Sequence, residues 1–285
     1  MSPDPARTAF ERWYGAALAG QDLLGAVHGV CSADCVIHMQ NGDDGDRAAT
    51  ETQTSQARAL YPDLAIEIED VITTDRRMLV QVSVSGTPSL VFRIARGRKV
   101  FGAIGAVVAD VNDRAEIIEM WAYLNPGAML TFPPASNLPL PPEPLHAPGT
   151  EADAAAVLAQ WKRARTGSEF LDAILATATR DCLVHATNTD NGTTALLESQ
   201  FHIVQAAFPD LTVSFSDGFV VEDRLVAQFT LDGTQRGWLG IAPPSGSRVQ
   251  STGAIIARVT ADRRVQEMWV YLAPGIGLFF PRRES

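Results

Sequence analysis

The nine residues Glu-Met-Trp-Ala-Tyr-Leu-Asn-Pro-Gly at positions 119–127 return as Glu-Met-Trp-Val-Tyr-Leu-Ala-Pro-Gly at positions 267–275. Upstream of this stretch, residues 34–87 align without gaps on residues 181–234, with 18 identities in 54 positions. Similarity at a fixed offset is the signature of a repeated structural unit. The sequence therefore predicts two copies of one fold in a chain of 285 residues.

A proline-rich stretch separates the copies. Residues 131–150 contain seven of the 17 prolines of the chain, and such a composition favours an extended, semi-rigid connector. We therefore expect a first domain at 1–132, a linker at 133–150 and a second domain at 151–285.

Each copy has the same order of predicted elements. Apolar residues at helical spacing, among them Phe10 and Trp13, predict a helix after Asp4-Pro5, and a second helix is expected near 23–30. A third helix is predicted at 46–60, where Pro62 stops it. Alternating residues predict strands at 35–39, 64–68, 77–86, 89–95, 100–110 and 115–124. Helices followed by an antiparallel sheet predict an α+β fold.

The last strand of each copy has two different faces, because side chains alternate along a strand. Glu119, Trp121, Tyr123 and Asn125 share one face, and Met120, Ala122 and Leu124 share the other. We expect the face with the carboxylate and the aromatic residues to line a cavity covered by the helices. The small apolar face then needs a partner sheet, so the two copies are predicted to pack sheet to sheet as an intramolecular pseudo-dimer. Whether two chains pair further is left open.

The composition excludes several classes of function. The 23 basic and 33 acidic residues give a net charge of −10, which disfavours nucleic acid because such binding depends on neutralising phosphates. The basic turn at 93–99 is interpreted as a solvated hairpin tip. Cys31, Cys35 and Cys182 form no C-x-x-C pair, so neither a disulfide framework nor a metal site is indicated. Without a signal peptide or a long apolar run, we expect a cytoplasmic protein that does not enter a membrane.

The second copy carries the motifs of a known family. Residues 233–246 read Gly-Thr-Gln-Arg-Gly-Trp-Leu-Gly-Ile-Ala-Pro-Pro-Ser-Gly, and they follow Ala-Phe-Pro-Asp-Leu at 207–211 and Asp-Cys-Leu-Val-His at 181–185. These stretches resemble the SnoaL-like polyketide cyclases, a branch of the nuclear transport factor 2-like superfamily. The first copy keeps Tyr61-Pro62-Asp63-Leu64, His38 and Glu119-Met120-Trp121. The resemblance covers most of residues 8–132 and 153–281.

The resemblance implies two tandem cone-shaped α+β barrels, each with about three helices on a curved, mostly antiparallel sheet. It also implies a pocket without a cofactor, in which an enolisable carbonyl compound cyclises by intramolecular aldol chemistry. In the family the acid/base is an aspartate four residues after the strand tryptophan, where this chain has Asn125 and Ala273. The histidine of the family's Thr-His pair is replaced by Pro88 and Gln235.

Four residues are candidates for acid/base catalysis. His38 and His185 occupy matching positions in the first strand of each copy, and histidine titrates near neutral pH; the alternative is a buried structural histidine. Glu119 and Glu267 are expected to point inward, where burial raises the pKa of a carboxyl; the alternative is an ion pair with an arginine such as Arg93. Asp63 and Asp210 are interpreted as turn residues.

Aromatic and amide side chains form the predicted binding surface for a small-molecule ligand. Most of these residues also suit an ordinary core, because aromatic side chains dominate domain interiors. The candidates are Tyr14, Tyr61, Trp121, Tyr123, Asn125, Trp161, Gln235, Trp238, Trp269 and Tyr271. Three interpretations stay open at this point: a cyclase or isomerase, a small-molecule binder without catalysis, and a structural fusion in which one copy covers the other.

Overall fold

The computed structural model divides the chain into two compact units, Met1–Pro126 and Gly127–Ser285. It describes residues 4–19, 23–39, 44–48, 51, 55, 58–59, 61–87, 101–123, 146–186 and 191–272. Within these ranges, no helix is both long enough and apolar enough to cross a bilayer.

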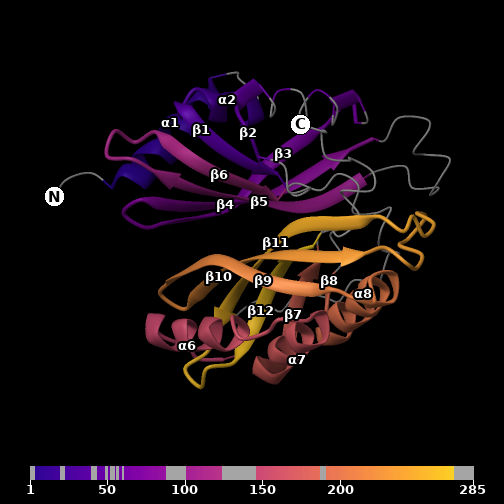
Figure 1. Ribbon diagram of the computed structural model, residues 1–285. Coiled ribbons are helices and arrows are strands. Elements are labelled where there is room, and N and C mark those ends of the chain that lie inside the picture. Colours follow the sequence, from indigo (N-terminus) through magenta and orange to yellow (C-terminus); the bar gives the residue numbers. More distant parts are fainter. Residues whose placement is uncertain are drawn as a thin grey trace. The chain divides into compact units, whose positions relative to one another are not determined.

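The first unit begins with helices and continues into a sheet (Figure 1). Asp4 caps the first helix by accepting hydrogen bonds from the backbone N–H groups of Ala6 and Arg7, which compensates donors that have no partner inside the helix. The elements are α1 (Pro5–Leu18), α2 (Leu23–His28), β1 (Cys31–Met39), β2 (Asp44–Gly45), β3 (Ala65–Thr73), β4 (Arg77–Gly86), β5 (Phe101–Val111) and β6 (Ile117–Tyr123).

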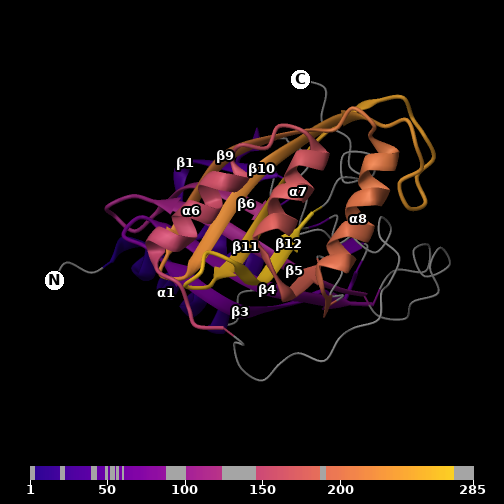
Figure 2. The same cartoon turned by 90° about the horizontal axis from the view of Figure 1, so that it is seen from below.

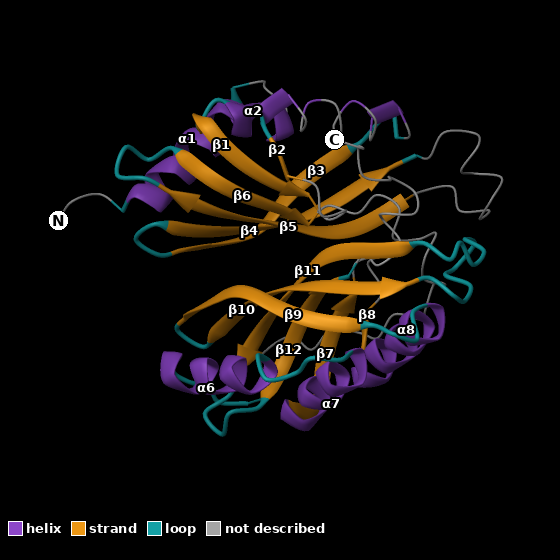
Figure 3. Ribbon diagram, viewed as in Figure 1, coloured by secondary structure: helices purple, strands orange, loops and turns teal. Residues whose placement is uncertain are grey.

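The described part of the second unit repeats this order with three helices, which cover one face of its sheet (Figures 2 and 3). Capping boxes start two of the helices: Thr150 pairs with Asp153, and Thr166 pairs with Glu169. The elements are α6 (Glu151–Trp161), α7 (Gly167–Thr177), β7 (Ala178–Ala186), β8 (Asn191–Gly192), α8 (Thr194–Ala207), β9 (Thr212–Val221), β10 (Arg224–Thr234), β11 (Arg248–Val259) and β12 (Val265–Tyr271).

The two sheets have the same topology. Their strand orders are β2-β1-β6-β5-β4-β3 and β8-β7-β12-β11-β10-β9. All neighbours pair antiparallel except β1 with β6 and β7 with β12, which are parallel. The strand after the helices thus lies beside the last strand of its own unit.

The predicted fold class is confirmed, since each unit is α+β with a mostly antiparallel sheet. Strand β1 is longer than the predicted 35–39, because it begins at Cys31 and includes a bulge against β6. The predicted strand at 89–95, the basic turn at 93–99 and most of the predicted linker and third helix lie outside the described residues. The sheet-to-sheet pairing of the units stays a prediction.

Two motifs shared by the copies meet in each unit at the end of a hairpin. Asp63 accepts hydrogen bonds from the backbone N–H and the hydroxyl of Thr87, at 2.5 and 2.7 Å. Asp210 accepts the same two bonds from Thr234, at 2.7 and 2.8 Å. These aspartates therefore hold the turn after the third-helix region against the end of β4 or β10.

We expect Asp210→Asn to lower the melting temperature at neutral pH. The donors on Thr234 lower the pKa of Asp210, so its carboxylate stabilises the folded state above the carboxyl's unfolded pKa, and this contribution is lost as pH falls through the lower folded value. The amide of the variant is neutral at every pH. Melting temperatures of both proteins across acidic pH should therefore converge, and a constant difference would contradict the assignment.

Candidate functional site

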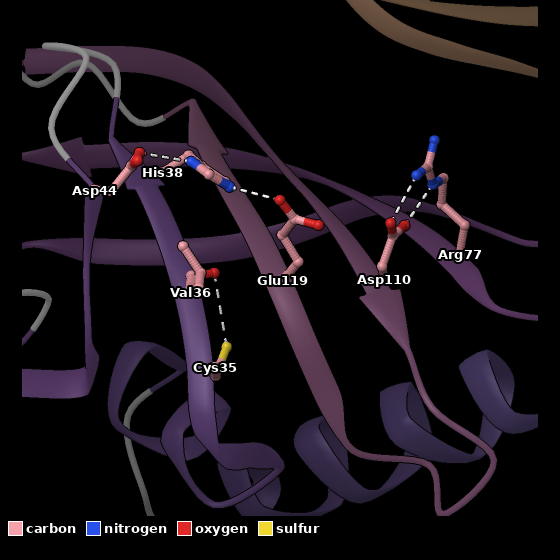
Figure 4. A network of polar contacts seen from close by, with 7 residues as sticks. All are labelled: Cys35, Val36, His38, Asp44, Arg77, Asp110 and Glu119. Atoms are coloured by element: carbon pink, nitrogen blue, oxygen red, sulfur yellow. Dashed lines mark hydrogen bonds and ion pairs between the residues drawn. The ribbon is translucent and has the colours of Figure 1, made fainter.

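His38 lies at the centre of a polar cluster on the sheet of the first unit (Figure 4). Its Nδ1 is 2.6 Å from Asp44 Oδ1 on β2, and its Nε2 is 2.8 Å from Glu119 Oε1 on β6. The imidazole stacks on Trp121 with ring centroids 4.9 Å apart. Nearby, Arg77 makes a two-bond ion pair with Asp110, and its guanidinium lies 6.0 Å from the centre of the Trp121 ring.

Both ring nitrogens of His38 have a carboxyl partner. Nδ1 contacts Asp44 and Nε2 contacts Glu119, so neither nitrogen is available to a ligand. A catalytic role for His38 would first require one of these contacts to break.

The second unit repeats the cluster with one change. His185 Nε2 is 3.0 Å from Glu267 Oε1, and the ring stacks on Trp269 at 4.9 Å. The partner of Nδ1 is Asn191 Oδ1, at 2.9 Å, where the first unit has Asp44. Arg258 Nη1 approaches Glu267 Oε2 at 3.6 Å, so this glutamate has the arginine partner that the alternative reading of the sequence anticipated.

The predicted orientation of the last strand is wrong. In the second unit the core between the helices and the sheet contains Met268 and Val270 of β12 together with Cys182 and Val184 of β7. His185, Glu267 and Trp269 alternate with these residues and therefore lie on the opposite face. Apolar helix faces select the more apolar face of the strand, and the His–Glu–Trp cluster is left on the other one. The matching register of β1 with β6 gives His38 and Glu119 the same placement.

Phenylalanine rings fill the space between the helices and the sheet of the second unit. Phe170 of α7 lies 5.5 Å from Phe201 of α8, 5.5 Å from Phe215 of β9 and 4.9 Å from Phe229 of β10, measured between ring centroids. The backbone of Gly253 makes room for one ring, since a Cβ there would lie 2.7 Å from two atoms of Phe229. At this position of the second unit, the space between the helices and the sheet is therefore filled by its own side chains.

The first unit has smaller residues at the equivalent places. Phe229 pairs across the sheet with Phe215 and Gly253, and in the first unit Val82 pairs with Ile68 and Gly105 in the same register. The glycine that accommodates a phenyl ring is thus retained, while the ring itself is replaced by an isopropyl group. At these two positions of the sheet, Val82 and Ile68, the first unit consequently has less side-chain volume than the second.

His28 was not predicted as a functional residue. It is the last residue of α2 and only 7% exposed. Its Nδ1 lies 3.5 Å from Glu51 Oε1, and its Nε2 is buried without a hydrogen-bond partner among the described residues. A histidine oriented by a carboxylate, with the second nitrogen free, is the usual arrangement of a general acid or base.

The predicted binding residues occupy different environments. Trp161 is fully buried and its indole N–H donates to Thr177 Oγ1 at 2.9 Å. Gln235 holds the turn at 236–246, because its amide bonds the backbone of Gly237, Pro243 and Ser245. The remaining candidates divide by exposure: Tyr61, Tyr123 and Tyr271 are buried, Trp121 and Trp269 are half-buried, and Tyr14 and Trp238 are exposed.

Three further observations concern these candidates. Burial raises the pKa of Tyr61 to about 12, so its phenol stays protonated at neutral pH. Asn125 and Ala273 lie outside the described residues. In the second unit a shallow recess with a cavity volume of about 10 Å³ is lined by Phe208, Leu211, Leu231, Val249 and Ser251, so it has no room for a ligand of this class.

Comparison with known proteins finds a match to a family model in the second unit. Residues 156–272 match the model of the SnoaL-like polyketide cyclase family. No curated protein matches the chain. Similar solved structures include AclR, a proposed hydroxylase from Streptomyces galilaeus, at 21% identity over 48% of this chain and 86% of that chain, with a TM-score of 0.39.

Two further solved structures are similar over one part of the chain. IdmH, a proposed polyketide cyclase from Streptomyces antibioticus, is 21% identical over 41% of this chain and 89% of its own, with a TM-score of 0.36. A proposed SnoaL-like polyketide cyclase from Jannaschia is 21% identical over 46% of this chain and 90% of its own, with a TM-score of 0.36.

Proposed function

We propose that the first unit binds a small, enolisable carbonyl compound between its helices and its sheet, and that His28 moves a proton of this ligand. The second unit, which contains the SnoaL-like domain, then contributes stability and no ligand site of this kind. The proposal keeps the chemistry that the resemblance implies and assigns it to one copy.

The difference between the two interiors carries this proposal. Both units place a glycine opposite the same position of the sheet, but the first has Val82 where the second has Phe229. Packed interiors rarely leave space of this size unfilled, and we assign the volume of the missing ring to a guest. The walls near Val82 are apolar, since Val80, Val84 and Val107 are also buried, and apolar walls suit a planar organic ligand.

His28 supports the catalytic part of the proposal. As a base, Nε2 would take a proton from a carbon beside a carbonyl group, which leaves an enolate. The enolate carbon would then attack a second carbonyl carbon of the same molecule, forming one C–C bond, and the new alkoxide would recover the proton from His28. No atom is lost and no electron leaves the substrate. Glu51 would hold the imidazole and stabilise its charged form.

The repeat favours the same residue. At the position of His28 the second copy has Leu175, which packs against the apolar core of that unit. A histidine and a roomier interior thus occur in the same copy. His28 would substitute for the family aspartate, whose positions hold Asn125 and Ala273.

A binder without catalysis is the second candidate function. It is favoured by the loss of the family aspartate at both equivalent positions, because neither an amide nor a methyl group transfers a proton. In this case the first unit would retain its ligand site, and the His28–Glu51 pair would only fix α2 against the segment that carries Glu51.

Proton exchange on a simple ketone tests the catalytic role. We expect the full-length protein to accelerate the exchange of the α-protons of 1-tetralone with D2O, measured by NMR, and His28→Gln to lose most of the about 10²–10⁴-fold effect that one acid/base group contributes. Glu51→Gln should lower the rate less, because it only positions the ring.

Two matched histidine variants serve as controls. His202→Gln changes an exposed histidine of α8 and should leave the exchange rate unchanged. His38→Gln should also retain it; loss of exchange in this variant alone would move the acid/base role to His38. Binding of 1-tetralone without any accelerated exchange would overturn catalysis and leave the binder.

A further inference from the structure

Cys31 and Cys35 are brought together by a bulge at the start of β1. In a regular strand, residues four apart are separated by about 13 Å, which exceeds the Cα separation of about 7 Å that a disulfide can span. Here Cys31 pairs with Ile117 and Val36 pairs with Glu119. The five residue steps from Cys31 to Val36 thus lie opposite only two steps along β6, which span about 6.6 Å. The residues between Cys31 and Val36 therefore fold back, and this shortens the distance between the two cysteines.

The two thiols differ in character. The Cys31 thiol donates to the backbone carbonyl of Val27 at 3.4 Å, and the Cys35 thiol donates to that of Val36 at 3.8 Å. The neighbouring Cys35 side chain and the charge of Arg47 lower the pKa of Cys31, whereas the Cys31 side chain together with burial raises the pKa of Cys35. Cys31 is half-buried and Cys35 is buried. A thiol with more thiolate character and partial exposure is the more reactive member of such a pair.

The second unit provides an internal comparison. Its β7 has a matching bulge, because Ala178 pairs with Val265 and Leu183 with Glu267. There the equivalent of Cys31 is Ala178, and Cys182 is fully buried among apolar side chains. Burial raises the pKa of Cys182 to about 12. Only the first copy therefore combines two thiols at this bulge.

We propose that Cys31 and Cys35 form a dithiol that hydroperoxides oxidise reversibly to an intramolecular disulfide. In the first step the Cys31 thiolate attacks one peroxide oxygen, the O–O bond breaks, and the leaving oxygen departs as water after taking up a proton. The sulfur becomes a sulfenic acid. In the second step the Cys35 sulfur attacks this sulfur, the S–O bond breaks, and a second water leaves. Two thiols and one hydrogen peroxide thus give one disulfide and two waters.

This site is independent of the proposed ligand site. Cys31 and Cys35 lie at the beginning of β1, and the proposal requires neither a ligand nor His28. Reduction by a dithiol of the thioredoxin class would restore both thiols through a mixed disulfide. The pair therefore responds to the balance of peroxide and thiol in its surroundings.

Thiol counting on the full-length protein tests the proposal. After treatment with hydrogen peroxide, denaturation and alkylation with iodoacetamide, we expect one labelled cysteine, Cys182, where the untreated protein has three. The peptide containing Cys31 and Cys35 should lose the mass of two hydrogens and regain both labels after reduction. Loss of the Cys31 label should be at least about tenfold faster than loss of the Cys182 label, because reactivity follows thiolate content and exposure.

Variants separate the two steps. Cys35→Ser should stop the reaction at the sulfenic acid, which dimedone traps on Cys31, and Cys31→Ser should prevent the mass change altogether. Cys182→Ser is the matched control and should behave as the unaltered protein. The proposal would be overturned if all three labels were retained, if Cys182 reacted as fast as Cys31, or if disulfides formed between chains. The measurement on the unaltered protein does not depend on the folding of any variant.

Discussion

Val82→Phe should weaken ligand binding by the first unit without destabilising it. The second unit accommodates a phenyl ring at this position opposite a glycine, and the first unit retains the glycine as Gly105. The added ring would therefore occupy the space that we assign to the ligand. We expect the affinity for 8-anilino-1-naphthalenesulfonate, measured by fluorescence titration, to fall at least about tenfold, or about 1.4 kcal/mol.

The control for this variant lies in the other copy. Phe229→Leu removes ring volume from the second unit only and should leave the affinity of the first unit unchanged. If circular dichroism shows that Val82→Phe is folded and its affinity for the probe is unchanged, the assignment of the ligand site to the first unit is wrong. A sharp loss of stability would equally contradict it, because it would show that no space was available.

Phe229→Ala should destabilise the second unit by about 3–5 kcal/mol, the usual cost of truncating a buried phenylalanine. Its ring contacts Phe170 and Phe215, and the glycine opposite it cannot fill the cavity. Urea unfolding followed by circular dichroism gives the free energy, and hydrogen exchange read by mass spectrometry shows which unit loses protection.

Val82→Ala is the matched substitution in the first unit. It removes fewer buried atoms and should cost less than Phe229→Ala. If both variants lowered the free energy of unfolding by the same amount, Val82 would be as tightly packed as Phe229. The proposed extra space in the interior of the first unit would then be refuted. If protection fell in the first unit after Phe229→Ala, the two units would not unfold independently.

The architecture was largely predictable from the repeat, because two copies of the same pattern constrain each other. Alternation of apolar and polar residues predicts strand β4 at 77–86 and the matching strand β10 of the second copy. Asp4-Pro5 marks the start of α1. The orientation of the last strand was not predictable in this way. Alternation tells which residues share a face, but both faces of β12 carry large apolar side chains, and only the packed helices select Met268 over Trp269.

The candidate site was predicted in part. The pairing of His38 with Glu119 and of His185 with Glu267 could not be read from the sequence, since each pair joins strands about 80 residues apart. His28 was missed because its partner Glu51 lies on another segment. A signal was nevertheless present: His28 and Val82 stand where the second copy has Leu175 and Phe229, so the differences between the copies, and not their identities, point to function.

The strand order has a consequence for biosynthesis. Because β1 lies between the short β2 and the last strand β6, its main neighbour is the final part of the unit to leave the ribosome. Until Ile117–Tyr123 emerges, the nascent chain cannot close its sheet, and long-range pairings of this kind form late. During translation β1, which carries Cys31, Cys35 and His38, therefore waits longest for its main neighbouring strand. The nascent chain is consequently most vulnerable to oxidants and to misassembly at this edge of the sheet.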